Sequence, residues 1–172
     1  MGRLLKTVEY APERDRLLIP LTDESATIDL GRRLAGMLSP GHTVLLSGGL
    51  GSGKSTLARA IIQAQAGAAI DVPSPTFTLV QTYELPRGEV WHFDLYRLGD
   101  PDEVWELGFS DAVEAALVLV EWPDRLGPLT PADRLDVGLT PVAGASGRQA
   151  ELVATGPLAR TIVRSLLALL AP

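Results

Sequence analysis

The sequence contains no cysteine, only two lysines and few aromatic residues. Without cysteine, disulfide bonds, thiol catalysis and cysteine-ligated metal sites are excluded. No apolar run approaches the roughly 18 to 20 uncharged residues that a membrane span needs, since the longest candidate, residues 162–171, is short and contains Arg164. The N-terminal residues also lack the apolar segment of a secretory signal. We therefore expect a cytoplasmic protein that has no part in a membrane.

Positive charge is scarce as well, with 15 basic residues against 21 acidic ones and a net charge of −6. Proteins that bind nucleic acid unaided usually present a basic face, because neutralising phosphates supplies much of their affinity. Here the basic residues are scattered and form no dense run. We therefore expect no direct binding of DNA, and action on RNA only through partner proteins.

The 172 residues suit one domain. We expect it to cover residues 1–172, with residues 1–15 as a peripheral N-terminal segment. Apolar runs of strand length and helical periodicities alternate along the chain. The expected strands are residues 16–20, 43–47, 77–84, 90–96, 117–121, 135–139 and 149–154. The expected helices begin after Thr22 or Asp23 and end at Pro40-Gly41, cover 56–67, cover 100–115 with a break near Gly108, and begin again at Pro157.

The order of these elements predicts an α/β fold. Continuous apolar runs at residues 43–47 and 117–121 are typical of strands that are buried on both faces. Only residues 85–89 separate the strands at 77–84 and 90–96, which is too short for a parallel crossover. These two strands should therefore form an antiparallel hairpin. The expected sheet is mixed, parallel at its centre and flanked by helices.

Residues 48–55 read GGLGSGKS and fit G-x-x-x-x-G-K-[ST], between an apolar strand and a helix. Glycines let backbone N–H groups turn inward as a nest for phosphate oxygens, and the helix N-terminus adds the positive end of its dipole. Lys54 would place a charge on the phosphates, and the Ser55 hydroxyl could ligate Mg²⁺. The pattern predicts a P-loop NTPase that binds ATP and Mg²⁺. The nucleotide-binding residues expected in the loop are Gly48, Gly51, Ser52, Gly53, Lys54, Ser55 and Thr56.

P-loop enzymes normally hold Mg²⁺ with help from an acidic residue at the end of a neighbouring buried strand. Glu121 and Asp94 are the two candidates. The strand of Glu121 follows a helical crossover, so it can place Glu121 at the carboxyl edge of the sheet, where ligands of open α/β sheets bind. The approach of Asp94 depends on how the hairpin folds over the site. We interpret His92 as a half-buried strand residue rather than a catalytic group.

Two further features flank the expected site. Residues 74–77 (SPTF) lie where many P-loop switches hold a threonine that senses the γ-phosphate. Thr76 or Ser74 could do so here, but a turn stiffened by Pro75 explains the segment equally well. Trp122 is of a type that more often packs than acts, although its place beside Glu121 makes it a candidate site residue.

Several segments together resemble the TsaE family, the bacterial ATPases of tRNA threonylcarbamoyladenosine biosynthesis. The resemblance runs from about Asp23 to the last pair of strands, in the family's order. The P-loop alone is generic, but its combination with the other segments is specific. These segments are GGLGSGKST (48–56), SPTFTLVQTYE (74–84), HFDLYRL (92–98), ELGF (106–109) and EWPDRLG (121–127).

The resemblance implies an ATPase that is weak alone, works with TsaB and TsaD, and resets their complex between rounds of tRNA modification. It implies that Ser55 and Glu121 ligate Mg²⁺ and that Asp94 supports the metal or the attacking water. It places Thr76 in a switch segment, Trp122 as a residue that positions the site, and Glu24 beside the adenine. The family mostly has threonine at position 55, so we expect at most a changed Mg²⁺ affinity. Residues 1–15 and 141–147 lie outside the family pattern.

Other functions share a P-loop. A small-molecule kinase would use the same nucleotide site, with Asp94 as a base toward a hydroxyl group, but no segment is typical of an arginine-bearing lid. A guanine-nucleotide switch would need an N-K-x-D element, which the sequence lacks. A regulatory module could bind the nucleotide without hydrolysing it. We expect the ATPase and keep the kinase as the alternative.

Overall fold

The computed structural model describes residues 8–170. Eight strands form one sheet, in the order β1-β2-β8-β7-β3-β6-β5-β4. The strands are β1 (Glu9–Ala11), β2 (Arg16–Leu21), β3 (Thr43–Ser47), β4 (Val80–Leu85), β5 (Gly88–Asp94), β6 (Leu117–Glu121), β7 (Arg134–Pro141) and β8 (Arg148–Thr155). The helices are α1 (Glu24–Ala35), α2 (Lys54–Ala66), α3 (Asp102–Glu106), α4 (Phe109–Ala115) and α5 (Pro157–Leu170), with short 3₁₀ helices η1 (Pro12–Arg14) and η2 (Pro123–Leu129).

The sheet is mixed and its centre is parallel, which confirms the expected fold class. Strands β7, β3, β6 and β5 are neighbours that run parallel, and the remaining pairs, including the β4–β5 hairpin, are antiparallel. The carboxyl ends of parallel strands lie at the same edge of a sheet. The ends of β3, β5 and β6 therefore bring the P-loop, Asp94 and Glu121 to one edge.

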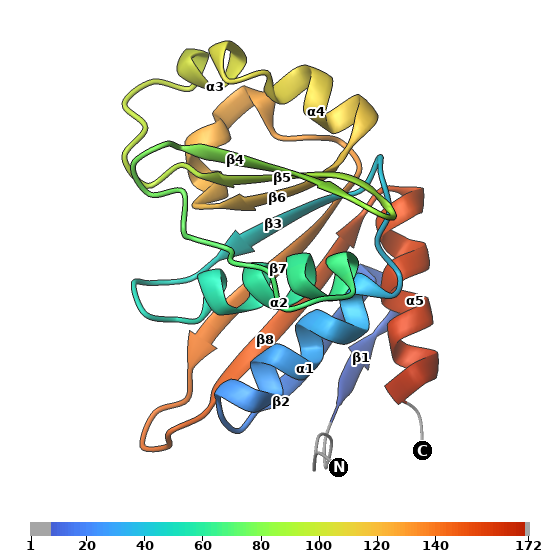
Figure 1. Ribbon diagram of the computed structural model, residues 1–172. Coiled ribbons are helices and arrows are strands. Elements are labelled where there is room, and N and C mark those ends of the chain that lie inside the picture. Colours follow the sequence, from blue (N-terminus) through green and yellow to red (C-terminus); the bar gives the residue numbers. More distant parts are fainter. Residues whose placement is uncertain (1–7, 171–172) are drawn as a thin grey trace.

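Helices cover the two faces of this sheet unequally (Figure 1). Helices α1, α2 and α5 pack on one face, where their apolar residues join the larger core cluster. Helices α3 and α4, together with η2, pack on the opposite face over β5, β6 and β3. The inner strand β6 is buried along its whole length, whereas β2, β7 and β8 alternate between buried and partly exposed residues. That difference explains why residues 117–121 are continuously apolar in the sequence.

Local interactions fix the two helices that border the P-loop. The side chain of Asp23 accepts the backbone N–H of Ala26 at 2.9 Å, so Asp23 rather than Thr22 caps α1. At the other end of α1, Gln65 of α2 donates to the Ala35 carbonyl at 2.8 Å. This satisfies a carbonyl that the helix end leaves without an intrahelical partner. Helix α1 therefore ends well before Pro40, earlier than expected.

Several expected boundaries were wrong. Strand β4 begins at Val80, not at residue 77, because the chain turns before it: Leu79 has a left-handed φ of 66° and donates its N–H to the Pro75 carbonyl. Only Pro86 and Arg87 separate β4 from β5, so the hairpin is tighter than the sequence suggested. The break near Gly108 is confirmed, with a φ of 81° between α3 and α4.

The N-terminal segment contributes a strand that the sequence analysis missed. Residues 9–11 form β1 at the edge of the sheet, paired with β2. A strand of three residues is too short to show a periodicity. The first seven residues of the expected peripheral segment lie outside the described residues. No helix in the described part of the chain is long and apolar enough to cross a membrane.

Candidate functional site

The loop between β3 and α2 owes its shape to its glycines. Gly48, Gly51 and Gly53 have φ values of 141°, 73° and 104°, a region that side chains rarely adopt. Gly48 has a second constraint, because an added Cβ would lie 2.5 Å from the Ser52 hydroxyl and 2.6 Å from the Leu139 carbonyl. The loop thus turns tightly at the carboxyl end of β3 and leads into the N-terminus of α2, which favours anions.

Lys54, the first residue of α2, is 4% exposed and lies inside the loop. Its Nζ donates to the carbonyls of Gly48 and Gly49, each at 2.8 Å, and sits 4.2 Å above the centre of the Trp122 ring. Burial lowers the pKa of the ammonium, and the carboxylates of Glu121 and Asp94 counteract this by favouring the charged form. The structure therefore holds a buried cation in the middle of the glycine-rich turn.

Glu121, the last residue of β6, reaches toward the start of α2. Its Oε2 accepts a hydrogen bond from the Ser55 hydroxyl at 2.9 Å. Its Oε1 lies 2.8 Å from Nε2 of His92, and Glu121 is only 2% exposed. Two oxygen groups suited to a hard cation, the Ser55 hydroxyl and the Glu121 carboxylate, thus lie side by side at the base of the loop.

Asp94 ends β5 directly beside Glu121, because the two residues are partners in the parallel register. Its carboxylate is held from two sides. Thr76 and Ser74 donate their hydroxyls to Oδ2 at 3.2 and 3.4 Å, and the Tyr96 N–H donates to Oδ1 at 3.1 Å. The SPTF segment is therefore tied to Asp94, and the fold of the hairpin brings this acid to the site.

Trp122 takes up a strained backbone conformation immediately after β6. Its φ of 59° and ψ of 55° lie in the left-handed region, which is unusual for a bulky residue. This conformation turns the indole toward Lys54 and against Tyr96, whose ring centre is 4.8 Å away. Strain of this kind persists only where the surroundings enforce it and is frequent at functional sites.

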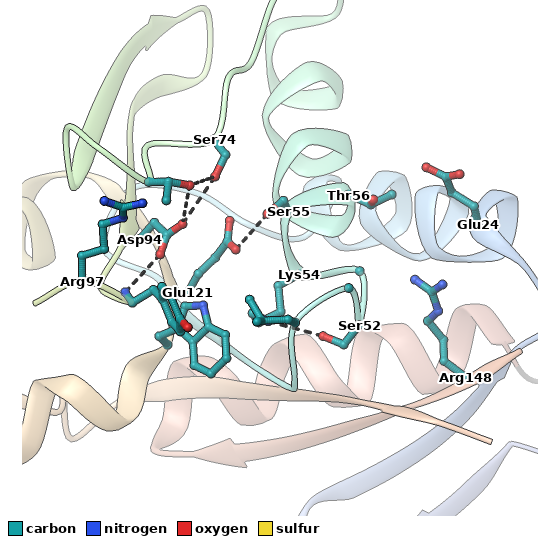
Figure 2. A pocket seen from close by; sticks show the side chains of 16 residues that line it. Glu24, Ser52, Lys54, Ser55, Thr56, Ser74, Asp94, Arg97, Glu121 and Arg148 are labelled. Carbon is teal, nitrogen blue, oxygen red and sulfur yellow. Dashed lines mark hydrogen bonds between the residues drawn. The ribbon is translucent and has the colours of Figure 1, made fainter. Parts of the chain in front are cut away.

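These groups surround a cavity of about 470 Å³. Figure 2 shows Glu24, Thr56 and Arg148 on one side of the P-loop lysine, and Ser74, Asp94 and Arg97 on the other. The lining includes twelve residues named from the sequence, but not Gly48, whose backbone conformation shapes the loop. The twelve are Glu24, Gly51, Ser52, Gly53, Lys54, Ser55, Thr56, Ser74, Thr76, Asp94, Glu121 and Trp122.

Other lining residues were not named as site residues from the sequence, namely Leu50, Tyr96, Arg97 and Arg148. Arg97 stacks on the ring of Phe77, with 4.4 Å between its Cζ and the ring centre. Arg148 opens β8, and its guanidinium lies where a Cβ on Gly53 would be. No pattern around Arg148 in the sequence indicates this position, because only the pairing of β8 with β2 and β7 brings it to the loop.

Comparison with known proteins shows the family of this chain. The family model described as "Threonylcarbamoyl adenosine biosynthesis protein TsaE" matches residues 21–150. The chain belongs to the TsaE family. A relative described as tRNA threonylcarbamoyladenosine biosynthesis protein TsaE from Rickettsia felis is 39% identical over 71% of this chain and 71% of its own length. A TsaE from Haemophilus influenzae is 34% identical over 83% of this chain and 92% of its own length. A crystal structure of Bacillus subtilis YdiB shares the fold, with a TM-score of 0.72 and 23% sequence identity. The similarity covers 95% of this chain and 98% of the YdiB chain.

The part of the chain that matches the TsaE family coincides with the site. Every residue that lines the cavity, from Glu24 to Arg148, falls within residues 21–150. Strand β1, at the edge of the sheet, and helix α5 lie outside the match, and neither contributes a residue to the cavity. Membership of the TsaE family therefore places this chain in tRNA threonylcarbamoyladenosine biosynthesis, and the matched region is the one that carries the cavity.

Proposed function

We propose that this TsaE-family protein binds ATP with Mg²⁺ in the cavity and hydrolyses it, together with TsaB and TsaD. In this proposal, hydrolysis resets the complex between rounds of tRNA modification in the cytoplasm. The observation that carries it is the contact between Ser55 and Glu121 next to a P-loop lysine. The net charge of −6 favours contact with tRNA through the partner proteins rather than directly.

The cavity suits a nucleoside triphosphate. Its volume of about 470 Å³ lies within the usual range of ligand sites. The left-handed glycines permit backbone N–H groups to face phosphate oxygens, and the α2 N-terminus adds its dipole. The Lys54 ammonium donates hydrogen bonds to the carbonyls of Gly48 and Gly49. Charged phosphate oxygens are stronger acceptors than carbonyls, so a bound phosphate can replace them as its partners.

The donor set at the base of the loop suits Mg²⁺. Ser55 and Glu121 would hold the ion, and Asp94 would hold it indirectly or orient the attacking water. No group of three or more His, Asp or Glu residues that could hold a metal occurs in residues 8–170. Mg²⁺ typically binds through one or two carboxylates, water and the phosphates, and Glu121 and Asp94 can supply the carboxylates. The bound ion would offset charge on the phosphates during hydrolysis.

The residues of this chain would divide the remaining work. Lys54 would neutralise charge on the β- and γ-phosphates, and Trp122 would close the site beside it. Asp94, held by Thr76 and Ser74, would keep a water in line with the γ-phosphate. A partner that rearranged the SPTF segment would therefore move the group that orients the water. This would explain hydrolysis that is weak in isolation.

The test is release of phosphate from ATP by the purified chain, with and without TsaB and TsaD, alongside formation of threonylcarbamoyladenosine in tRNA. Lys54→Ala should lower hydrolysis by about 10²-fold or more. Arg32→Ala, which removes an exposed cation of α1, is the control and should leave it unchanged. Hydrolysis at an undiminished rate in Lys54→Ala would refute the site. Transfer of phosphate to a metabolite without the partners would favour the small-molecule kinase.

A further inference from the structure

His92 is a polar exception on an apolar face of the sheet. It lies in β5 and is 1% exposed, so the expectation of a half-buried residue was wrong. The alternate residue Val90, and Leu119 in the register position beside His92, belong to the core cluster under α1 and α2. A histidine at such a position costs free energy unless its ring nitrogens find partners.

Only one of those nitrogens is satisfied. Nε2 lies 2.8 Å from Oε1 of Glu121. A carboxylate can only accept a hydrogen bond, so the hydrogen on the ring belongs to Nε2. The other nitrogen, Nδ1, is buried and has no hydrogen-bond partner within residues 8–170. A buried polar atom without a partner destabilises a protein and therefore calls for an explanation beyond packing.

The hydrogen bond determines how Glu121 is oriented. One carboxylate oxygen is held by His92 on β5, and the other is held by Ser55 on α2. The carboxyl group is thus fixed between a strand and a helix and cannot rotate without breaking a bond. His92 is not among the residues that line the cavity. It can therefore act on a ligand only through Glu121.

We propose that His92 is a positioning residue that holds Oε1 of Glu121, so that the other carboxylate oxygen, Oε2, faces Ser55 and the metal site. This inference rests on the proposed function, in which Glu121 and Ser55 hold Mg²⁺. Groups that hydrogen-bond to a metal ligand from behind commonly change metal affinity by about 10- to 100-fold when they are replaced. His92 occupies that place for Glu121.

Three variants separate orientation from packing. His92→Phe fills the space with a ring but removes the donor. His92→Gln keeps a donor that can reach the position of Nε2. His42→Phe removes the other histidine, which immediately precedes β3 and accepts a hydrogen bond from the Ser39 N–H rather than contacting the site. For each variant, binding of a fluorescent ATP analogue is titrated without metal and then against Mg²⁺, and thermal unfolding is followed in parallel.

We expect His92→Phe to raise the Mg²⁺ concentration for half-saturation by about tenfold or more, with metal-free affinity within about twofold of the unsubstituted protein. His92→Gln should restore most of the Mg²⁺ response, and His42→Phe should leave it unchanged. An unaltered Mg²⁺ titration in His92→Phe would overturn the inference. The inference would also be overturned if His92→Phe and His92→Gln weakened the Mg²⁺ response equally. It would be overturned too if His92→Phe weakened analogue binding as much without metal as with it. Either result would indicate a role in packing alone.

A double-substitution cycle covers the case in which His92→Phe folds poorly. In a Glu121→Ala background, His92→Leu, which removes the donor, and the histidine should give the same Mg²⁺ half-saturation, since the group that His92 orients is gone. A further effect of His92 in that background would refute the inference. Failure of the unsubstituted protein to bind the analogue in a Mg²⁺-dependent manner would instead refute the proposed function, and the inference with it.

Discussion

Helix α2, which begins at the P-loop, packs closely against α1 at Gly31, and this contact gives a stability prediction. Gly31 of α1 faces Ala60 of α2, and a Cβ added to Gly31 would lie 2.6 Å from the Ala60 Cβ and 3.2 Å from the Leu57 carbonyl. Neither carbon can rotate away, because each is attached directly to its backbone. The two helices would have to separate by roughly 1 Å to restore normal contact between carbon atoms.

Two effects of Gly31→Ala oppose each other. Alanine stabilises a helix by about 1 kcal/mol relative to glycine, whereas overpacking a well-packed core costs about 1 to 3 kcal/mol. Because the contact involves rigidly attached atoms of two helices, we take the upper end of that cost. The net loss should be about 2 kcal/mol, or a melting temperature lower by about 4 to 8 °C for a chain of this length.

The matched variant is Gly31→Ala with Ala60→Gly, which moves the methyl group from one helix to the other. Ala60→Gly alone should cost about 1 kcal/mol in helix propensity. The double variant should be more stable than Gly31→Ala, because the clash is removed, so the two effects should not add. Thermal and urea unfolding give the stability of the unsubstituted protein, the two single variants and the double variant. A melting temperature of Gly31→Ala equal to or above that of the unsubstituted protein would refute the reasoning.

Three other predictions concern the site and pH. Asp94→Asn should reduce partner-stimulated hydrolysis by about 10²-fold with nearly unchanged ATP affinity, and an equal loss of affinity would contradict its assignment to water. Trp122 lies 4.2 Å from the Lys54 ammonium, so its fluorescence should change when a nucleotide binds, and Trp122→Phe should abolish the change; a signal that survives in Trp122→Phe would assign it to another tryptophan. Burial lowers the pKa of His42 below 6.5, so the unfolded chain binds the proton first and the free energy of unfolding should fall as the pH drops through 6.5. His42→Asn, which keeps an acceptor for Ser39, should flatten that dependence, and an identical pH profile would refute the role of His42.

The sequence alone predicted the glycine-rich loop and the two acids that the structure places around the cavity. Residues 48–55 are contiguous, so their chemistry can be read without the fold. Asp94 and Glu121 end apolar strands, and the parallel arrangement of those strands brings such ends to one edge. The same reasoning could not tell how Asp94 approaches the site, because that depends on the turn at residues 76–79 and on the hydroxyls of Thr76 and Ser74.

A pattern of alternating residues reveals a strand only when the strand is long enough. Three residues of β1 cannot show alternation, and the bounds of β4 depend on the left-handed turn at Leu79, which a sequence pattern does not reveal at a residue other than glycine. The early end of α1 has a similar origin. Its last carbonyl is satisfied by Gln65 and by Arg87, which come from elsewhere in the chain.

By itself, the sequence determined what depends on neighbouring residues: the glycine-rich turn, the lysine within it, the buried strands and the acids that end them. Tertiary structure alone decided which distant groups meet there. His92 and Glu121 are 29 positions apart, Ser55 and Glu121 are 66 apart, and Arg148 arrives on another hairpin. The physical reason is that a local pattern sets backbone conformation, whereas strand order and register set which side chains share a cavity.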